Sequence, residues 1–244
     1  MTPRITLAVA RRVLVQLRRD HRTLAMLLVL PCLLMTLLWW MFQDLPGPGF
    51  GELAPALLAL IPTIVMFLVT SVTTLRERTS GTLERLLAMP MGKGDFLLGY
   101  AMAFGLVAVL QSALAVAVCI WFLDLRVSGP VWLLLLVAVM DALLGTALGL
   151  FVSAFARTEF QAVQFMPALL IPQILLCGLF VARDALPRVL EVVSDVLPLS
   201  YAVDAMSKVS TDADPPLWGD LAVVALYVVG GLVLGALTLR RQTD

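Results

Sequence analysis

The clearest pattern in the chain is an alternation between long stretches without charged residues and short charged segments. Five stretches lack Asp, Glu, Lys and Arg altogether, and a sixth, 127–156, is interrupted only by Asp141. Because about 20 mainly apolar residues in a helix cross about 30 Å of hydrocarbon, the pattern predicts six membrane-spanning segments. Their expected ranges are about 23–43, 54–75, 96–123, 131–156, 160–182 and 218–239.

These spans are expected to be helices rather than strands. Backbone groups in lipid must be satisfied within the protein, so only helices and closed barrels cross a membrane. The uncharged stretches are much longer than the alternating strands of about ten residues that build a barrel. Turn-forming sequences separate several of them, at 46–49, 128–130 and 215–216. The predicted fold is therefore an all-α membrane protein.

Composition supports this class and excludes others. The chain is 61% hydrophobic and 14% charged, with a mean hydropathy of +0.98, whereas soluble domains average about 45–50% apolar residues. A soluble enzyme and a disordered chain are both excluded. With 17 basic and 17 acidic residues, no net charge attracts nucleic acid. The three cysteines lie within apolar stretches, which favours packing over a disulfide or zinc site.

The distribution of basic residues predicts the orientation. If the N-terminus is cytoplasmic, thirteen Lys and Arg residues fall in inside segments and four in outside segments. By the positive-inside rule, both termini are expected in the cytoplasm. A cleaved signal peptide is the alternative for the first span, but that span is longer than a signal sequence and ends in Trp39 and Trp40.

Residues 1–22 form a separate cytoplasmic segment before the six-span domain of residues 23–244. On a helical wheel its basic residues form one face: Arg4, Arg11, Arg12, Arg18, Arg19 and Arg22. Val9, Val13 and Leu17 lie opposite. This pattern predicts an amphipathic helix at the cytoplasmic interface, with its apolar face toward the acyl chains. A charge cluster without helical structure is the alternative.

The segment 76–95, between the second and third spans, is predicted to contain a short amphipathic helix. Leu83, Leu86 and Leu87 have helical spacing, and Pro90 ends the pattern. A helix of two or three turns is not stable alone in water, so it should dock on another surface. That surface is either the protein itself or a partner protein.

Three stretches resemble one known family. Residues 78–90 (Arg-Thr-Ser-Gly-Thr-Leu-Glu-Arg-Leu-Leu-Ala-Met-Pro) resemble the coupling-helix segment of type-2 ABC exporter permeases, which include daunorubicin-resistance-type drug exporters and polysaccharide and Nod-factor exporters. Residues 172–187 resemble the family's fifth span and external loop, although Ala182 stands where proline is commoner. Residues 197–206 resemble the segment before its last span.

The resemblance implies a permease subunit in a bacterial-type inner membrane, which exports a lipophilic drug, lipid or related substrate. It pairs with a second permease copy, the same chain or a close homologue, and with ATP-binding subunits. ATP and Mg²⁺ would bind to those subunits, because the only Gly-Lys pair here, Gly92-Lys93, lacks the rest of a phosphate-binding loop. The expected contacts with the ATPase are Thr82, Leu83, Glu84, Arg85, Leu86 and Leu87.

Asp141 is the one charged residue well inside a predicted span. It shares a helical stripe with Gly145, Gly149 and Ser153, which lets another helix approach closely. The favoured interpretation is a structural aspartate that fastens the fourth span to a neighbour. A cation or proton site on the transport path is the alternative.

The fifth span combines polar residues with helix-distorting ones. Gln164 and Gln173 lie near Pro167 and Pro172, whose missing amides should kink the helix. These four residues are candidates for the substrate path. Together with Gln111 in the third span, the glutamines have an alternative role as hydrogen-bonding contacts between helices.

The external segment 184–217 is expected to be structured. Its apolar residues have helical spacing: Leu186, Val189, Leu190, Val193, Val196 and Leu197. We expect a short helix whose apolar face enters the outer membrane interface. A solvated loop is the alternative.

The sequence offers no catalytic or metal-binding constellation. His21 is the sole histidine, so neither a catalytic dyad nor a histidine metal pair can form within the chain. The chain is therefore predicted to be a permease without enzymatic activity or a cofactor of its own. A membrane-embedded enzyme acting on lipids, and a passive channel or receptor module, are the alternatives from other classes.

Overall fold

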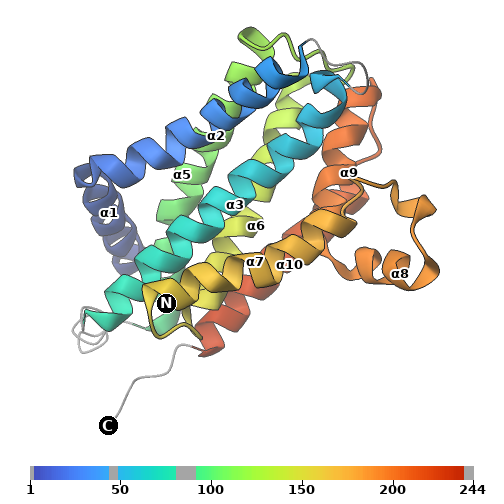
Figure 1. Ribbon diagram of the computed structural model, residues 1–244. Helices are drawn as coiled ribbons and strands as arrows, with labels where there is room; N and C mark the ends of the chain where they lie inside the picture. Colours follow the sequence, from blue (N-terminus) through green and yellow to red (C-terminus); the bar gives the residue numbers. More distant parts are fainter. Residues whose placement is uncertain (1–2, 44–48, 81–91, 239–244) are drawn as a thin grey trace.

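The computed structural model describes residues 3–43, 49–80 and 92–238, and these residues form a bundle of α-helices without a strand (Figure 1). Six helices are long and apolar enough to cross a membrane, which confirms the predicted number and the all-α class. They are α2 (His21–Phe42), α3 (Phe50–Thr79), α5 (Lys93–Trp121), α6 (Val131–Ser153), α7 (Glu159–Leu176) and α10 (Trp218–Thr238). The remaining elements are α1 (Pro3–Arg19), the 3-10 turn η1 (Arg183–Ala185), α8 (Arg188–Val196) and α9 (Pro198–Thr211).

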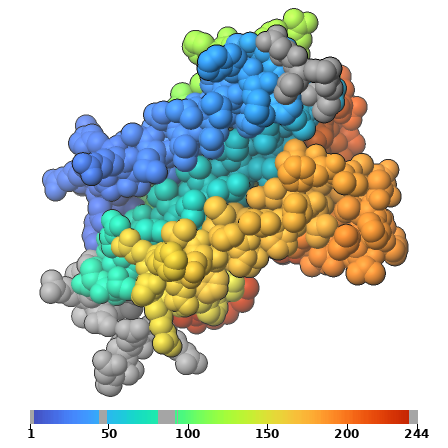
Figure 2. Space-filling model, viewed as in Figure 1, coloured from blue at the N-terminus to red at the C-terminus, as the bar shows by residue number. Residues whose placement is uncertain are grey.

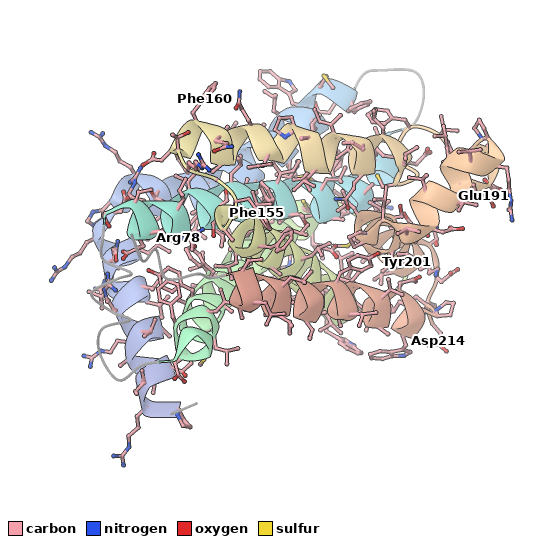
Figure 3. The ribbon with its side chains drawn as sticks, turned by 90° about the horizontal axis from the view of Figure 1, so that it is seen from below. Arg78, Phe155, Phe160, Glu191, Tyr201 and Asp214 are labelled. Carbon is pink, nitrogen blue, oxygen red and sulfur yellow. The ribbon has the colours of Figure 1, made fainter. Side chains whose placement is uncertain are left out.

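The bundle has two chemically different ends. One end carries α1, the last turn of α3, the first turn of α5 and the turn between α6 and α7; we call it the α1 end. The other carries α8 and α9 and is called the α9 end. Figure 3 shows Arg78, Phe155 and Phe160 toward the first, and Tyr201 and Asp214 toward the second. The basic residues therefore separate along the bundle as the sequence predicts, and the side of the membrane that each end faces stays a prediction.

The centre of the bundle is the contact between α3 and α6. A Cβ atom added to Gly145 would lie 2.2 Å from the Thr63 carbonyl oxygen, and one added to Gly149 would lie 2.6 Å from that of Phe67. The Thr63 hydroxyl donates a hydrogen bond of 2.8 Å to the backbone carbonyl of Asp141. The small-residue stripe predicted on the fourth span is therefore the surface on which α3 packs.

The outer helices α2, α7 and α10 carry exposed apolar side chains along much of their length. Examples are Trp40 on α2, Phe160 on α7 and Leu226 on α10. In Figure 2, α3 forms a band between α2 and α7. Such surfaces suit contact with lipid or with another membrane protein.

The first helix confirms the predicted helical structure, but its apolar face lies elsewhere than expected. Val9, Val13 and Leu17 are buried in the protein and belong to a cluster that includes residues of α5. A Cβ atom added to Gly99 of α5 would lie 2.6 Å from a methyl group of Val9. The expectation that this face enters the acyl chains is wrong, because α5 offers a closer-fitting apolar surface.

Several helix boundaries differ from the sequence prediction. Residues 76–79 belong to α3 rather than to a loop, and 93–95 belong to α5. Helix α7 ends at Leu176, whereas the sequence predicts that the fifth span reaches 182. Gly178 has a φ of +94°, and a right-handed helix cannot continue through a residue in that conformation. Beyond it, α8 confirms the expected helix of the external segment, and α9 is a buried helix that was not predicted.

Candidate functional site

The last turn of α3 connects three neighbouring helices through three consecutive side chains. Arg76 donates two hydrogen bonds, of 2.9 and 3.1 Å, to the carboxylate of Glu159 on α7. Glu77 faces α1, and Arg78 donates to the backbone carbonyl of Ser153 at the end of α6. Successive residues on an α-helix point about 100° apart, so one turn reaches helices on three sides.

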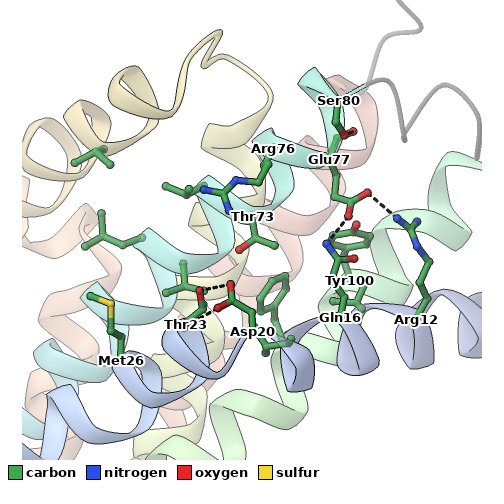
Figure 4. A pocket seen from close by; sticks show the side chains of 17 residues that line it. Arg12, Gln16, Asp20, Thr23, Met26, Thr73, Arg76, Glu77, Ser80 and Tyr100 are labelled. Atoms are coloured by element: carbon green, nitrogen blue, oxygen red, sulfur yellow. Dashed lines mark hydrogen bonds and ion pairs between the residues drawn. The ribbon is translucent and has the colours of Figure 1, made fainter.

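Glu77 is the buried member of the three, with 5% of its surface exposed. Its carboxylate accepts hydrogen bonds of 2.9 Å each from Arg12 Nη2 and Gln16 Nε2, both on α1 (Figure 4). Tyr100 of α5 lies next to the same carboxylate. Two donors from α1 therefore converge on one carboxylate, which ties α1 to the last turn of α3.

The first turn of α5 is bound to α1 as well. The Thr6 hydroxyl donates a hydrogen bond of 3.1 Å to Asp95, whose other carboxylate oxygen accepts one of 3.2 Å from the backbone amide of Gly92. Asp95 thereby caps the start of α5, where backbone amides have no partner within the helix. Helix α1 is thus attached both to the end of α3 and to the beginning of α5.

A pocket of about 600 Å³ lies beside this cluster, between α1, α2, α3, α5 and α7 (Figure 4). Its apolar lining residues are Val13, Leu17, Met26, Leu68, Val69, Val72, Phe104 and Val163. Its polar lining residues are Arg12, Gln16, Asp20, Thr23, Thr73, Arg76, Glu77, Ser80 and Tyr100. The pocket is therefore apolar on one side and polar on the other, as suits an amphiphilic ligand.

Each charged group that lines the pocket is held by a neighbouring side chain. Arg12 pairs with Glu77, and Arg76 pairs with Glu159 just outside the lining. Asp20 accepts hydrogen bonds of 2.7 Å from the hydroxyl and 3.1 Å from the amide of Thr23, and these bonds lower the pKa of its carboxyl group. Arg12, Arg76 and Glu77 are thus held in ion pairs, and the Asp20 carboxylate is held by hydrogen bonds alone.

The predicted coupling residues, Thr82, Leu83, Glu84, Arg85, Leu86 and Leu87, lie outside the described residues. Asp141 is fully buried between α6 and α3, and neither of its carboxylate oxygens has a hydrogen-bond partner among the described residues. The bond that joins the two helices here uses its backbone carbonyl instead of its side chain.

The substrate-path candidates on α7 do not share one face. Gln164, Pro167 and Pro172 are exposed, whereas Gln173 is buried and donates a hydrogen bond of 3.0 Å to the Leu169 carbonyl. None of these four lines the pocket described above.

Gln111 of α5 is fully buried, and its amide has no partner in the described part of the chain. The predicted role of Gln111 as a contact between helices is therefore not seen as a hydrogen bond here. Its function stays a prediction, like that of the glutamines on α7.

Sequence reasoning missed the cluster around Glu77. The sequence does contain a signal for it: Glu77 comes just after the second apolar stretch, and the basic face of residues 1–22 offers partners for an acidic side chain. The sequence alone places Glu77 in a loop and Arg12 on the basic face of an amphipathic helix, and it does not connect the two.

Comparison with known proteins identifies the family. The family described as "ABC-2 type transporter" matches residues 4–210. "Probable multidrug ABC transporter permease YbhR" of Escherichia coli (strain K12) is 29% identical over 155 residues, which are 64% of this chain and 42% of that protein. YbhS of the same organism, also named a probable multidrug ABC transporter permease, is 25% identical over 181 residues, covering 74% of this chain and 48% of that protein. "ABC transporter G family member 20" of Dictyostelium discoideum is 25% identical over 181 residues, or 25% of its length.

The chain spans less than half the length of each of these relatives. The family match nevertheless covers most of the chain, from the beginning of α1 to the end of α9. With its six apolar helices, this multi-pass membrane protein belongs to the ABC-2 type transporter family.

Proposed function

We propose that the protein is the permease of an ABC exporter in a bacterial-type inner membrane, which moves a lipophilic drug or lipid out of the cell. The observation that carries this proposal is the pocket at the α1 end, in a chain of the ABC-2 type transporter family. The relatives named as multidrug permeases agree with a lipophilic substrate.

The pocket suits a lipophilic molecule that carries a hydrogen-bond acceptor. Its volume of about 600 Å³ lies within the roughly 300–1,000 Å³ that small-molecule sites occupy. Its polar lining includes the hydroxyl groups of Thr73 and Ser80 and the amide of Gln16. A carbonyl, ether or phosphate oxygen could accept hydrogen bonds from such groups, while the rest of the molecule contacts the apolar wall.

The position of the pocket favours access from the lipid. Two of its lining residues, Met26 on α2 and Val163 on α7, are also exposed on the outer surface of their helices. Both helices carry other exposed apolar side chains, so a molecule dissolved in the membrane can reach the pocket without crossing water. The exposed amide of Gln164 points about 100° away from Val163 around α7 and is a candidate contact for a second permease copy.

Energy for transport is proposed to come from ATP and Mg²⁺ bound by a separate subunit. The last turn of α3, which contacts three helices, leads directly into the segment that holds residues 82–87. A movement imposed on that segment by an ATPase would reach α1, α6 and α7 together. The leucines at 83, 86 and 87 would supply the apolar docking contact.

The pocket is tested by filling it from α7. The variant Val163→Trp should reduce stimulation of ATP hydrolysis by lipophilic compounds, because the indole occupies space that the substrate needs. The control Val229→Trp lies on the exposed surface of α10, away from the pocket, and should retain stimulation. The measurement is ATPase activity of the reconstituted complex over a range of compound concentrations. Equal stimulation in both variants would refute the pocket as the substrate site.

The ATPase contact is tested separately. Leu86→Asp combined with Leu87→Asp should leave the permease inserted in the membrane but prevent it from co-purifying with the ATP-binding subunit. Loss of burial of two leucines is worth about 1.5–3 kcal/mol for each. If the double variant captured the subunit and exported at the parental rate, residues 82–87 would not form the coupling contact.

A further inference from the structure

We infer that α1 is a strut that fixes the separation between the end of α3 and the beginning of α5. Residues 81–91 join these two helix ends in sequence. By holding the ends in place, α1 would position that connection for the ATPase subunit. The inference rests on the proposed function, and it assigns a role to Thr6, Arg12, Gln16 and Glu77.

The first attachment of the strut is to α5 and is made by close packing. Thr6 and Val9 lie against α5, where the position of Gly99 leaves no room for a side chain. A Cβ atom on Gly99 would lie 2.6 Å from Val9 Cγ1 and 3.0 Å from the backbone carbonyl oxygen of Thr6. The hydrogen bond from Thr6 to Asp95 fixes the helix at the same place. Because backbones are this close, α1 cannot slide along α5 without a clash.

The second attachment is to α3 and is of a different kind. In the described part of the chain, α1 packs extensively on α5 but meets α3 through long polar side chains. Arg12 and Gln16 each donate a hydrogen bond of 2.9 Å to Glu77. Helical spacing of four residues places both donors on one face of α1, directed at the same carboxylate.

The length of the strut follows from helix geometry. Thr6, at the first attachment, and Gln16, at the second, are ten residues apart within one uninterrupted helix. At about 1.5 Å per residue, Arg12 and Gln16 lie about 9 and 15 Å from Thr6 along the helix axis. An α-helix of this length is stiff, so α1 keeps the two helix ends at a set distance as long as both attachments hold.

Each attachment also acts on the helix end beside the connection. Glu77 lies in the last turn of α3, and Asp95 caps the first turn of α5 through the Gly92 amide. Loss of either contact should therefore widen the range of positions available to that end. The direct consequence is a poorer fit of residues 82–87 to the ATPase, with no change in the chemistry of hydrolysis.

The separation can be measured by spin labels at positions 79 and 92, in the full chain in lipid nanodiscs, with the three native cysteines replaced by alanine. The parental protein should give a narrow distance distribution. Glu77→Gln, which weakens the attachment to α3, and Thr6→Val, which weakens the attachment to α5, should each broaden this distance distribution. The control Arg126→Gln removes an exposed ion pair with Asp124 at the α9 end and should leave it unchanged.

A charge exchange separates positioning from general stability. Arg12→Glu combined with Glu77→Arg keeps opposite charges facing each other and should restore the narrow distribution that each single change loses. In parallel, Glu77→Gln should weaken capture of the ATPase subunit about five- to tenfold. The rate of ATP hydrolysis per captured subunit at saturation should stay at the parental value.

The outcomes separate the strut from the proposed function. If Glu77→Gln and Thr6→Val both keep the narrow distribution, or if the charge exchange gives no rescue, the strut is refuted and the exporter proposal stands. If the parental protein captures no ATPase subunit, the proposed function fails, and the distance distributions still decide whether α1 fixes the helix ends.

Discussion

Glu77 and Asp141 are both buried carboxyl groups, yet their surroundings differ. Glu77 accepts hydrogen bonds from Arg12 and Gln16, whereas both carboxylate oxygens of Asp141 lack a partner in the described part of the chain. Glu77 thus holds α1 to α3 through its side chain, whereas at Asp141 the bond between α3 and α6 uses the backbone carbonyl. The two buried carboxyl groups therefore contribute differently to the packing of the bundle.

This difference predicts the effect of Asp141→Asn. The amide keeps the size and hydrogen-bonding capacity of the side chain, so expression and export should both remain close to parental values. Export of a fluorescent lipophilic compound from cells, with membrane content measured in parallel, checks the prediction. Normal membrane content with abolished export would mean that the carboxyl group ionises during the transport cycle.

Gly145 offers a second test at the scale of one atom. Gly145→Ala places a Cβ atom against the backbone of Thr63 and should lower the free energy of unfolding by about 1–3 kcal/mol through overpacking. The matched control is Gly230→Ala on α10, where no atom lies within 4 Å of the new Cβ. The control should be neutral or slightly stabilising, because alanine favours the helix. Thermal unfolding in detergent compares the two; similar midpoints would contradict the close contact.

At the scale of helices, the features predicted best from the sequence are those that depend only on the length of an apolar stretch. The six apolar helices follow from uncharged stretches, because lipid requires internal hydrogen bonding along each of them. Helix α9 was missed although Leu199, Val203 and Met206 have helical spacing, because the segment carries too many polar residues to resemble a span. Local sequence does not show which surface covers an amphipathic face. The spacing of the valines in α1 is equally compatible with contact to lipid and with contact to α5.

The candidate site was less predictable than the fold, for a related reason. Arg12 and Glu77 are 65 residues apart in sequence, and no local rule joins them. Hydrophobic periodicity places each residue near one end of a helix. Only the packing of α1 on α5 brings the two side chains together.

The junction of α1 and α2 gives a prediction about pH. Hydrogen bonds from the Thr23 hydroxyl and amide hold the pKa of Asp20 below its usual value of 3.8. A lowered folded-state pKa stabilises the protein above the unfolded value, and this stabilisation is lost as pH falls through the folded value. Asp20→Ala should therefore lower the unfolding midpoint at about pH 7, and the difference from parental protein should shrink toward about pH 3.

The control for this prediction is Asp20→Asn, which keeps a capping oxygen but does not titrate. Its midpoint, measured in the same detergent, should differ from that of Asp20→Ala by a pH-independent amount. A difference between parental protein and Asp20→Ala that stayed constant over the whole range would show that the cap does not depend on charge.

At the scale of the whole molecule, burial and charge are organised along different directions. Burial decreases outward from α3 and α6 to α2, α7 and α10, as expected for a bundle whose outer surface meets lipid. Charge changes along the bundle axis, with the arginines of α1 at one end and Arg126, Arg183, Arg188 and Lys208 at the other. The first arrangement shows how the protein packs, and the second predicts how it is oriented.

The orientation is tested by labelling from outside the cell. Single cysteines at Thr79, near the α1 end, and at Asp212, at the α9 end, are introduced into a cysteine-free background. With the α1 end in the cytoplasm, a membrane-impermeant thiol reagent should label position 212 and not 79 in intact cells. Both positions should react after the cells are lysed. Labelling of 79 alone in intact cells would reverse the topology.

The packing of α1 against α5 also has a consequence for biogenesis. Val9 and the Gly99 surface that receives it are separated by the first two spans, so the ribosome makes them at different times. At about 5–20 residues per second, a nascent α1 waits roughly 5–20 s before its partner exists. During that interval its apolar face has only the membrane interface to cover it, a location for which its arginine-rich opposite face is suited. The amphipathic pattern of α1 would thus serve a temporary membrane-bound state in a newly made chain, before α5 takes the place of the lipid.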